Sequence, residues 1–490
     1  MAAPLPLSPL DQIDPADAWK PWAPSASDPW DRTWAAHLYR RAAFGASGPE
    51  LARAVRAGHA ATLELLLNGT EKSGELVDTL NDVGRVAATR DTDGTELRGW
   101  WLYCMLQGGH PLREKLALFW HNHFATSIAK VREPGLMFRQ NVTFRAHALG
   151  RFGPLLHAVT RDPAMLVWLD SNTNVKGKPN ENYARELMEL FSLGVGNYSE
   201  ADVREAARSF SGWHTSGSSF RFNAAQHDGG PKTVLGRTGN WDGNAVVKIV
   251  LDQPACARFL VRKLYAAFVS ELPLPERLLE PLGDTFRKSG YDIAALMRTI
   301  LGSRLFYSGH ALRKRIGSPI EYALGAVRAT YRRYEEDDAH FRPLAHQRLL
   351  RWLAGMGQVL FAPPNVKGWP GGKTWLNTAT VLERNNFAAA LVSGTLWMPP
   401  LEEQAFVVSA DVPPPKAFDP ARVLEEENVT RPADVVRALL DRYVPGGVRA
   451  AAREKLVAFV AEDAPTGLLL ARRAREVAHA ILTMPEAQLV

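Results

Sequence analysis

The sequence is poor in cysteine and has no long apolar run. Its two cysteines, Cys104 and Cys256, are too few for a disulfide framework or a cysteine-based zinc site. A bound metal would therefore need His, Asp or Glu ligands. No stretch of about 18 or more apolar residues is present, so we expect no membrane span. Residues 1–30 lack a basic segment followed by an apolar one, which favours the cytoplasm as the compartment.

The sequence also lacks a strong charge of one sign. The 490 residues include 58 Lys and Arg against 52 Asp and Glu, a net charge of +6. Basic residues gather in "RKRIG" (313–317) and "ARRAR" (471–475), which we interpret as solvated helix faces. A nucleic-acid binder usually has a denser basic stripe with interleaved aromatics, so these data argue against nucleic acid as a partner. Phosphate-binding glycine loops and the common hydrolase motifs are missing as well.

Helical periodicity dominates what is present, so the sequence predicts a mainly α, multi-helical globular protein. One stretch, 213–244, is rich in glycine and alternating residues and predicts a small extended or hairpin insert. Proline-rich segments suggest the domain boundaries. The predicted parts are an irregular lead-in (1–30), a main helical domain (31–395), a linker (396–420) and a small C-terminal helical segment (421–490).

Two histidines lie close together in "LREKLALFWHNHFATS", residues 112–127. On a helix, His123 shares the apolar face of Leu116 and Phe119, whereas His121 lies about 200° away. The two rings can reach one metal only if the helix ends at Asn122. The alternative is a buried, hydrogen-bonded His123 and a surface His121.

A second helix is predicted in "PNENYARELMELFSLGVG". Glu181, Arg185 and Glu189 follow one another at intervals of four, which indicates a charge ladder on one face. Glu186 lies about 60° from the buried Tyr183, at the border of the apolar face. An ionised carboxylate at such a border needs a partner, either an arginine in an inter-helix ion pair, a histidine or a metal.

Two loops carry further polar residues. In the insert, His227 and Asp228 stand at a glycine turn, where they can ligate a metal or simply make the turn. The loop "NVKGWPGGKTWLN" suggests either an aromatic and cationic rim for a glycan or a structural loop. Its candidate rim residues are Lys367, Trp369, Lys373 and Trp375.

Several of these motifs, in this order, resemble the bacterial family called domain of unknown function 1800. The motifs are "HLYRRAAFG", "FWHNHFATS", "PAMLVWLD", "NENYARELMELFSLGVGNYSEADVREAARSFSGW", "FRFNAAQHDGGPKTVLG" and "NVKGWPGGKTWLN". The resemblance implies export and a sulfatase-like partner protein, and it assigns no catalytic residue. The sequence departs from that pattern because it shows no recognisable leader.

Two hypotheses about function follow. The first is a helical enzyme, hydrolytic or redox, with a histidine and carboxylate site that holds a divalent metal or works without one. In the metal-free form, Glu186 or His123 is the general base and Arg185 steadies an anion. The metal ligands would come from His121, His123, Glu186, His227 and Asp228. The second hypothesis is a non-catalytic binding or scaffold protein with a buried His/Glu network. Convergence of His123, Glu186 and His227 on one pocket would favour the enzyme, and separate local pairing would favour the scaffold.

Overall fold

The computed structural model describes residues 9–70, 73–330, 343–397, 424 and 429–490. It is mainly helical, as predicted, with two small hairpins in the predicted insert. The predicted lead-in is irregular apart from two short helical pieces between Leu10 and Ala18. Its first eight residues, and the predicted linker from 398 to 420, lie outside the described residues.

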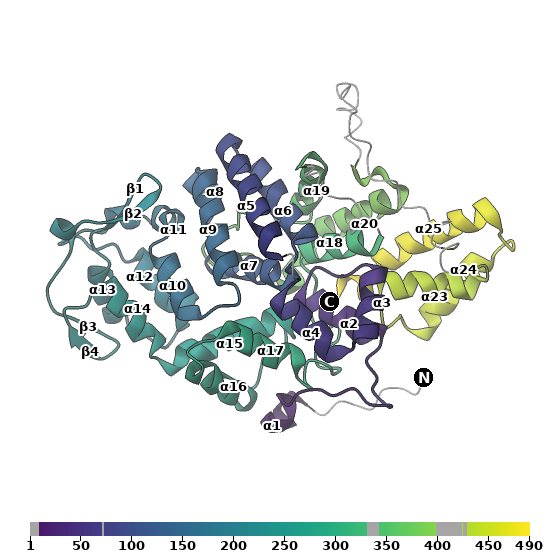
Figure 1. Ribbon diagram of the computed structural model, residues 1–490, viewed down its shortest axis with the longest axis horizontal. Coiled ribbons are helices and arrows are strands. Elements are labelled where there is room, and N and C mark those ends of the chain that lie inside the picture. The colour runs from purple at the N-terminus through teal and green to yellow at the C-terminus, as the bar shows by residue number, and fades with distance from the viewer. Residues whose placement is uncertain (1–8, 71–72, 331–342, 398–423, 425–428) are drawn as a thin grey trace.

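The first third of the chain folds as a succession of helices (Figure 1). Several begin at side-chain caps, such as Ser47 before α3, which forms a capping box with Glu50. These helices are α1 (Pro15–Ala18), α2 (Arg32–Ala42), α3 (Gly48–Ala57), α4 (His59–Asn68), α5 (Ser73–Arg90), α6 (Thr95–Gln107), α7 (Pro111–His123), α8 (Ile128–Val131), α9 (Pro134–His147), α10 (Phe152–Thr160) and α11 (Pro163–Trp168).

The middle of the chain contains the two hairpins, which lie at one end of the molecule in Figure 1. Strands β1 (Trp213–Ser216) and β2 (Ser219–Phe222) pair antiparallel, and so do β3 (Lys232–Val234) and β4 (Arg237–Gly239). The helices in this part of the chain are α12 (Asn182–Glu186), which continues as a π-helical segment (Leu187–Ser192), then α13 (Glu200–Ser209), α14 (Gly243–Leu251), α15 (Pro254–Phe268), α16 (Glu276–Lys288) and α17 (Ile293–Gly302).

The remaining helices occupy the opposite side of the molecule, with the last three at its far end (Figure 1). They are α18 (Pro319–Thr330), α19 (Pro343–Gly355), α20 (Thr378–Ser393), α23 (Pro432–Tyr443), α24 (Ala450–Ala461) and α25 (Gly467–Thr483). The "RKRIG" stretch before α18 is not the solvated helix face that we predicted. It forms turns, and Arg313 donates to the carbonyls of Pro445 (2.6 Å) and Gly447 (2.8 Å), which ties the C-terminal helices to the rest of the chain.

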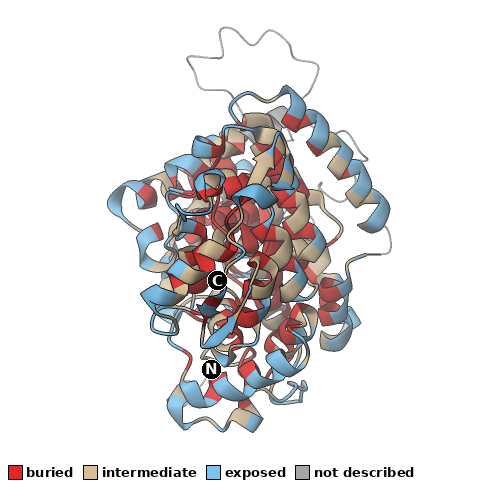
Figure 2. Cartoon of the chain, turned by 90° about the vertical axis from the view of Figure 1, so that its left-hand side faces the viewer, coloured by how far each residue is buried: buried red, intermediate tan, exposed pale blue. Residues whose placement is uncertain are grey.

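Buried apolar side chains form two core clusters, which fill the middle of the molecule in Figure 2. The first core is built mainly by α2, α4, α10 and α12–α17, and the second by α5, α6, α18–α20 and α23–α25. Helix α7 contributes to both: Leu116 and Trp120 belong to the first core and Leu118 to the second. We call α7 the central helix because it has one side in each core.

Polar side chains of the central helix are buried too. Glu114, fully buried, accepts a hydrogen bond from Arg145 Nε of α9 (2.9 Å). The next residue, Lys115, pairs with Glu321 of α18 (2.6 Å). A buried ion pair has no access to water, so its geometry fixes how the two helices pack. None of the helices in the described ranges is long and apolar enough to cross a membrane.

Candidate functional site

The two histidines of the central helix point into different cores. Helix α7 continues through Asn122 and ends at His123, so the condition for a shared metal is not met. His121 is buried against the rings of Trp101, Phe361 and Trp369. His123 is buried in the first core, where its ring lies 4.5 Å from that of Phe124. The predicted surface position of His121 is therefore wrong, because the second core covers that side of the helix.

Both imidazoles are held in the neutral form. Burial lowers the pKa of His121 to about 3. For His123, burial and then the positive charge of Lys263 lower the pKa well below its usual value. His123 Nε2 donates a hydrogen bond to the carbonyl oxygen of Phe191 (3.0 Å), which fixes the ring against the π-helical segment. His123 is thus a buried, locally bonded side chain.

Glu186 ends α12, directly before the π-helical segment. In this segment the Leu193 N–H bonds the carbonyl of Met188 (2.9 Å), five residues back, so the turn is wider than an α-turn. The wider turn takes Glu189 out of the predicted charge ladder. Glu189 accepts instead from the hydroxyl of Tyr198 (3.0 Å) and lies close enough to Glu186 for their charges to interact. Widened turns of this kind are frequent at functional sites.

The Glu186 carboxylate is half-buried and, in the described part of the chain, has no hydrogen bond or ion pair. Burial raises its pKa, and the like charge of Glu189 raises it further. The charges of Arg185 and Lys367 act in the opposite direction. A partly buried carboxylate without a partner costs stability. Carboxyl groups with perturbed pKa values are concentrated at functional sites, where this cost serves binding or catalysis.

Arg185 is engaged with other carboxylates and does not pair with Glu186. It donates to Glu200 through Nη1 (2.7 Å) and to Glu181 through Nη2 (3.0 Å). The hydrogen bonds that Arg185 donates to Glu200 raise the pKa of Arg185. The structure thus places Arg185 in an exposed ion-pair network beside the Glu186 carboxylate.

The loop 361–377 brings a third motif to the same place. Asn122 Oδ1, on the third side of the central helix, accepts from the backbone N–H of Trp369 (2.7 Å). The preceding Gly368 packs directly on Asn122 at a φ of +80°, and a Cβ there would lie 2.2 Å from Asn122 Oδ1. This contact holds the exposed Lys367 within electrostatic range of Glu186. Trp369 and Trp375 are 6% and 7% exposed, so they do not form the aromatic rim that we considered.

His227 and Asp228 belong to the hairpin region and have partners of their own. His227 Nδ1 donates to the Ser211 carbonyl (2.9 Å). Asp228 accepts from Arg208 through both oxygens (2.8 and 3.2 Å), and this pairing lowers the pKa of Asp228 to about 2. These contacts fasten the turn to the end of α13.

The five residues predicted as metal ligands therefore lie in four separate surroundings. Within the ranges that the structure describes, no group of three or more His, Cys, Asp or Glu side chains is placed to hold a metal ion. What the fold does assemble is a surface of three motifs around one acidic pair. We call it the Glu186 surface and define it by Glu186, Glu189, Lys367 and the supporting Asn122 and Gly368.

The sequence did not point to two of the residues that shape this region. In the sequence, Asn122 stands out only as the residue at which the helix would have to end for the two histidines to share a metal. In the structure Asn122 lies between two buried histidines, so its side chain points to a third side of the helix. Lys263 of α15 lies over the ring of Phe259 (5.3 Å) and near His123, and burial lowers its pKa. Nothing in its local sequence distinguishes Lys263 from a surface lysine.

The fold and the Glu186 surface define a mainly helical protein with an unpaired, half-buried carboxylate among three distant motifs. The chain belongs to the family described as Protein of unknown function (DUF1800), whose model matches residues 37–489. No curated protein and no solved structure matches the chain.

Proposed function

We propose that this protein is a non-catalytic binding protein and that its Glu186 surface binds the partner. One observation carries the proposal: His123 and His227 are each bonded locally, whereas Glu186 is left without a partner where three motifs meet. Local pairing is what a binding or scaffold protein predicts for the histidines. An unpaired acid at the edge of solvent is a group that a ligand can neutralise.

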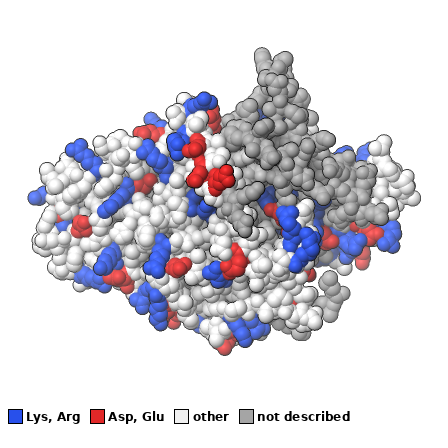
Figure 3. Space-filling view, viewed as in Figure 1, with Lys and Arg blue, Asp and Glu red and all other residues white. Residues whose placement is uncertain are grey.

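The proposed partner is the sulfatase-like protein that the family resemblance implies. The Glu186 surface offers it two carboxylates and the exposed Lys367, so a complementary partner presents a basic side chain to Glu186 and an acidic one to Lys367. On the face shown in Figure 3, basic and acidic side chains are interspersed over the described residues. Recognition would thus depend on local pairs rather than on a broad field of one sign.

The test is binding of the purified full chain to the purified sulfatase-like protein from the same source, measured by calorimetry. Glu186→Gln should weaken binding about tenfold or more, because the partner's buried cation is left unpaired. Glu200→Gln is the matched control, since Glu200 is an exposed carboxylate already paired with Arg185. Equal affinities for wild type and Glu186→Gln, or no binding by the wild type, would contradict the proposal.

A second candidate is an enzyme that uses Glu186 as a general acid or base. The raised pKa of Glu186 favours it, because carboxyls that transfer protons near neutral pH show such a shift. Here Glu186→Gln should abolish turnover of any substrate found in a hydrolase screen, whereas Glu200→Gln should not. Turnover that survives Glu186→Gln would exclude this role.

For the compartment we propose the cytoplasm. Cys104 and Cys256 are both free thiols in the interior, which a reducing compartment preserves. Cell fractionation of the full-length product tests this, and recovery from the periplasm or the medium would instead support the export that the family resemblance implies.

A further inference from the structure

A second cluster of charges lies in the interior, at the end of α2 and away from the Glu186 surface. Its centre is Arg41, which is fully buried. Arg41 Nη2 donates to the Ala311 carbonyl (2.6 Å). In the described part of the chain, its Nε and Nη1 atoms have no hydrogen-bond partner. A buried guanidinium with unused donors is costly, so these donors point to a ligand that accepts hydrogen bonds.

The carboxylates near Arg41 are already occupied. Glu321 Oε1 accepts from Lys115 (2.6 Å) and Arg315, and Glu321 Oε2 accepts from the Ser318 N–H (2.8 Å). Glu271, the other carboxylate that acts on Arg41, accepts from the Ile316 N–H (3.0 Å). Neither residue donates or accepts a hydrogen bond with Arg41.

The cluster carries an excess of positive charge. Three cations, Arg41, Lys115 and Arg315, face two carboxylates, Glu321 and Glu271, which leaves one positive charge unbalanced. Burial lowers the pKa of Lys115 to about 8 and that of Arg41 well below its usual value. One monovalent anion would balance the cluster.

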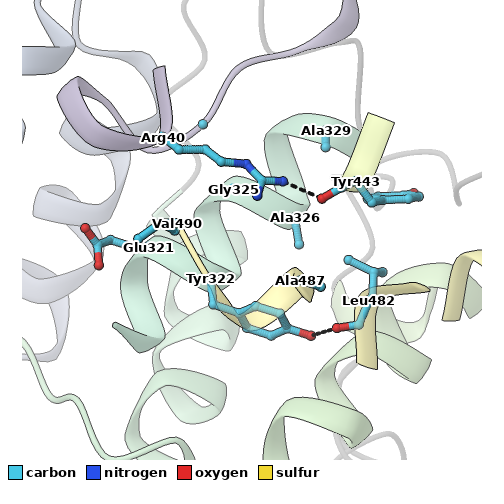
Figure 4. A pocket seen from close by; sticks show the side chains of 11 residues that line it. Arg40, Glu321, Tyr322, Gly325, Ala326, Ala329, Tyr443, Leu482, Ala487 and Val490 are labelled. Carbon is cyan, nitrogen blue, oxygen red and sulfur yellow. Dashed lines mark hydrogen bonds between the residues drawn. The ribbon is translucent and has the colours of Figure 1, made fainter. Parts of the chain in front are cut away.

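A narrow pocket borders the cluster at Glu321, which is the member of the cluster that lines it. The pocket is lined by Glu321 together with Arg40, Tyr322 and Tyr443. Figure 4 shows Glu321 at one side of the pocket and the Arg40 guanidinium bonded to the Tyr443 carbonyl at the other. A ligand that enters here meets the positive charge of Arg40, and Arg313 lies close enough for its charge to act on Arg40.

We propose that a small monovalent anion of the halide class binds at Arg41 Nη1 and stabilises the fold. The unpaired donors require an acceptor, the charge count requires a single negative charge, and the tight surroundings require a small ion. This site is independent of the Glu186 surface, so its test does not depend on the proposed partner.

The test is thermal unfolding of the full chain at constant ionic strength, with sodium gluconate replaced stepwise by sodium chloride. Binding predicts a rise in melting temperature of about 2–4 °C over the series that grows with the logarithm of the chloride concentration, because chloride binds only the folded state. Bromide should act like chloride, and a bromide-soaked crystal should show an anomalous peak beside Arg41. A melting temperature that does not change as chloride replaces gluconate, or the absence of that peak, would mean that water bridges the donors and would overturn the proposal.

Variants separate the site from general effects of salt. Arg41→Lys keeps the charge but removes the Nη1 donor, so the chloride response should be lost. Arg384→Lys is the matched control: this guanidinium is 2% exposed, and both its Nη atoms already donate, to Gln488 and Gly317 (2.9 Å each). It should keep the full chloride response, and an Arg41→Lys protein that keeps it too would contradict the site. Should Arg41→Lys fail to fold, the wild-type titration and the bromide peak still decide the question.

Discussion

The side chains of His121, Asn122 and His123 point away from the central helix in three directions. His121 enters the second core, His123 bonds the π-helical segment in the first core, and Asn122 meets Gly368. Successive helical positions differ by about 100°, so three consecutive residues can serve three different neighbours. The short HNH motif therefore connects both cores and the loop behind Glu186.

At Gly368 we predict that alanine is poorly tolerated. A Cβ would lie 2.2 Å from Asn122 Oδ1, and the φ of +80° adds backbone strain. Gly368→Ala should lower the free energy of unfolding by about 2–4 kcal/mol in a urea titration. Gly177→Ala has the same φ of +80° with no atom within 4 Å of the new Cβ, so it reports the backbone strain alone, about 1 kcal/mol. Equal losses would show that Asn122 moves aside at no cost.

At His121 we predict a link between stability and pH. The folded pKa of about 3 lies below the usual unfolded value, so the unfolded chain takes up the proton first. This contribution is constant above about pH 6.5, and stability falls as the pH drops from there towards 3, by up to about 1.4 kcal/mol per pH unit. His121→Phe, which keeps an aromatic ring beside Trp101, should show a shallower acid limb in urea titrations at several pH values. An acid limb as steep as that of the wild type would contradict the assignment.

At the scale of elements, ion pairs buried along the central helix fix how its neighbours pack. Glu114 bonds α9 through Arg145, and Lys115 bonds α18 through Glu321. The side chains of these adjacent residues point towards different elements, as do those of His121 and His123 at the C-terminal end of the helix. Polar contacts of this kind add little net stability but are costly to break, since a lone buried charge remains.

We therefore predict that Glu114→Ala is strongly destabilising. It leaves Arg145 buried without its carboxylate, and the free energy of unfolding should fall by about 3–5 kcal/mol. Glu64→Ala is the control, because Glu64 pairs with Arg298 at the surface, both side chains being 48% exposed, and its loss should cost no more than about 1 kcal/mol. Similar losses for the two variants in chemical denaturation would contradict the structural role of Glu114.

At the scale of the molecule, the central helix has one side in each of the two cores. Each core happens to contain one of the two cysteines: Cys256 lies in the first and Cys104 in the second. Both thiols are buried and free, so each reports the opening of its own core.

Because the central helix has apolar and polar contacts on both sides, we predict that the two cores unfold together. In a urea series, both thiols should become reactive towards a disulfide reagent over the same range of concentration, followed by mass spectrometry of the labelled peptides. Well-separated ranges would show that the cores are independent units and that α7 does not couple them.

The sequence determined the helices and their ends, because caps, prolines and apolar periodicity act over a few residues. Pro111 begins the central helix, Ser199 and Asp202 form a capping box before α13, and the predicted insert of 213–244 contains the two hairpins. The π-helical segment was not predicted, since the "LMELF" pattern fits an α-helix equally well and the wider turn depends on tertiary contacts such as His123 with Phe191.

The tertiary structure alone decided what the polar residues do. The spacing of two histidines sets the angle between them, but the second core buries His121, and two of the rings that cover it, Phe361 and Trp369, come from a loop much further along the chain. The sequence places Glu186 at the border of an apolar face. Only the tertiary structure decides that Glu186 has no partner in the described part of the chain, because Arg185 pairs with Glu181 and Glu200 instead. Local free energies specify elements, whereas the partner of a buried charge is set by whichever distant segment packs against it.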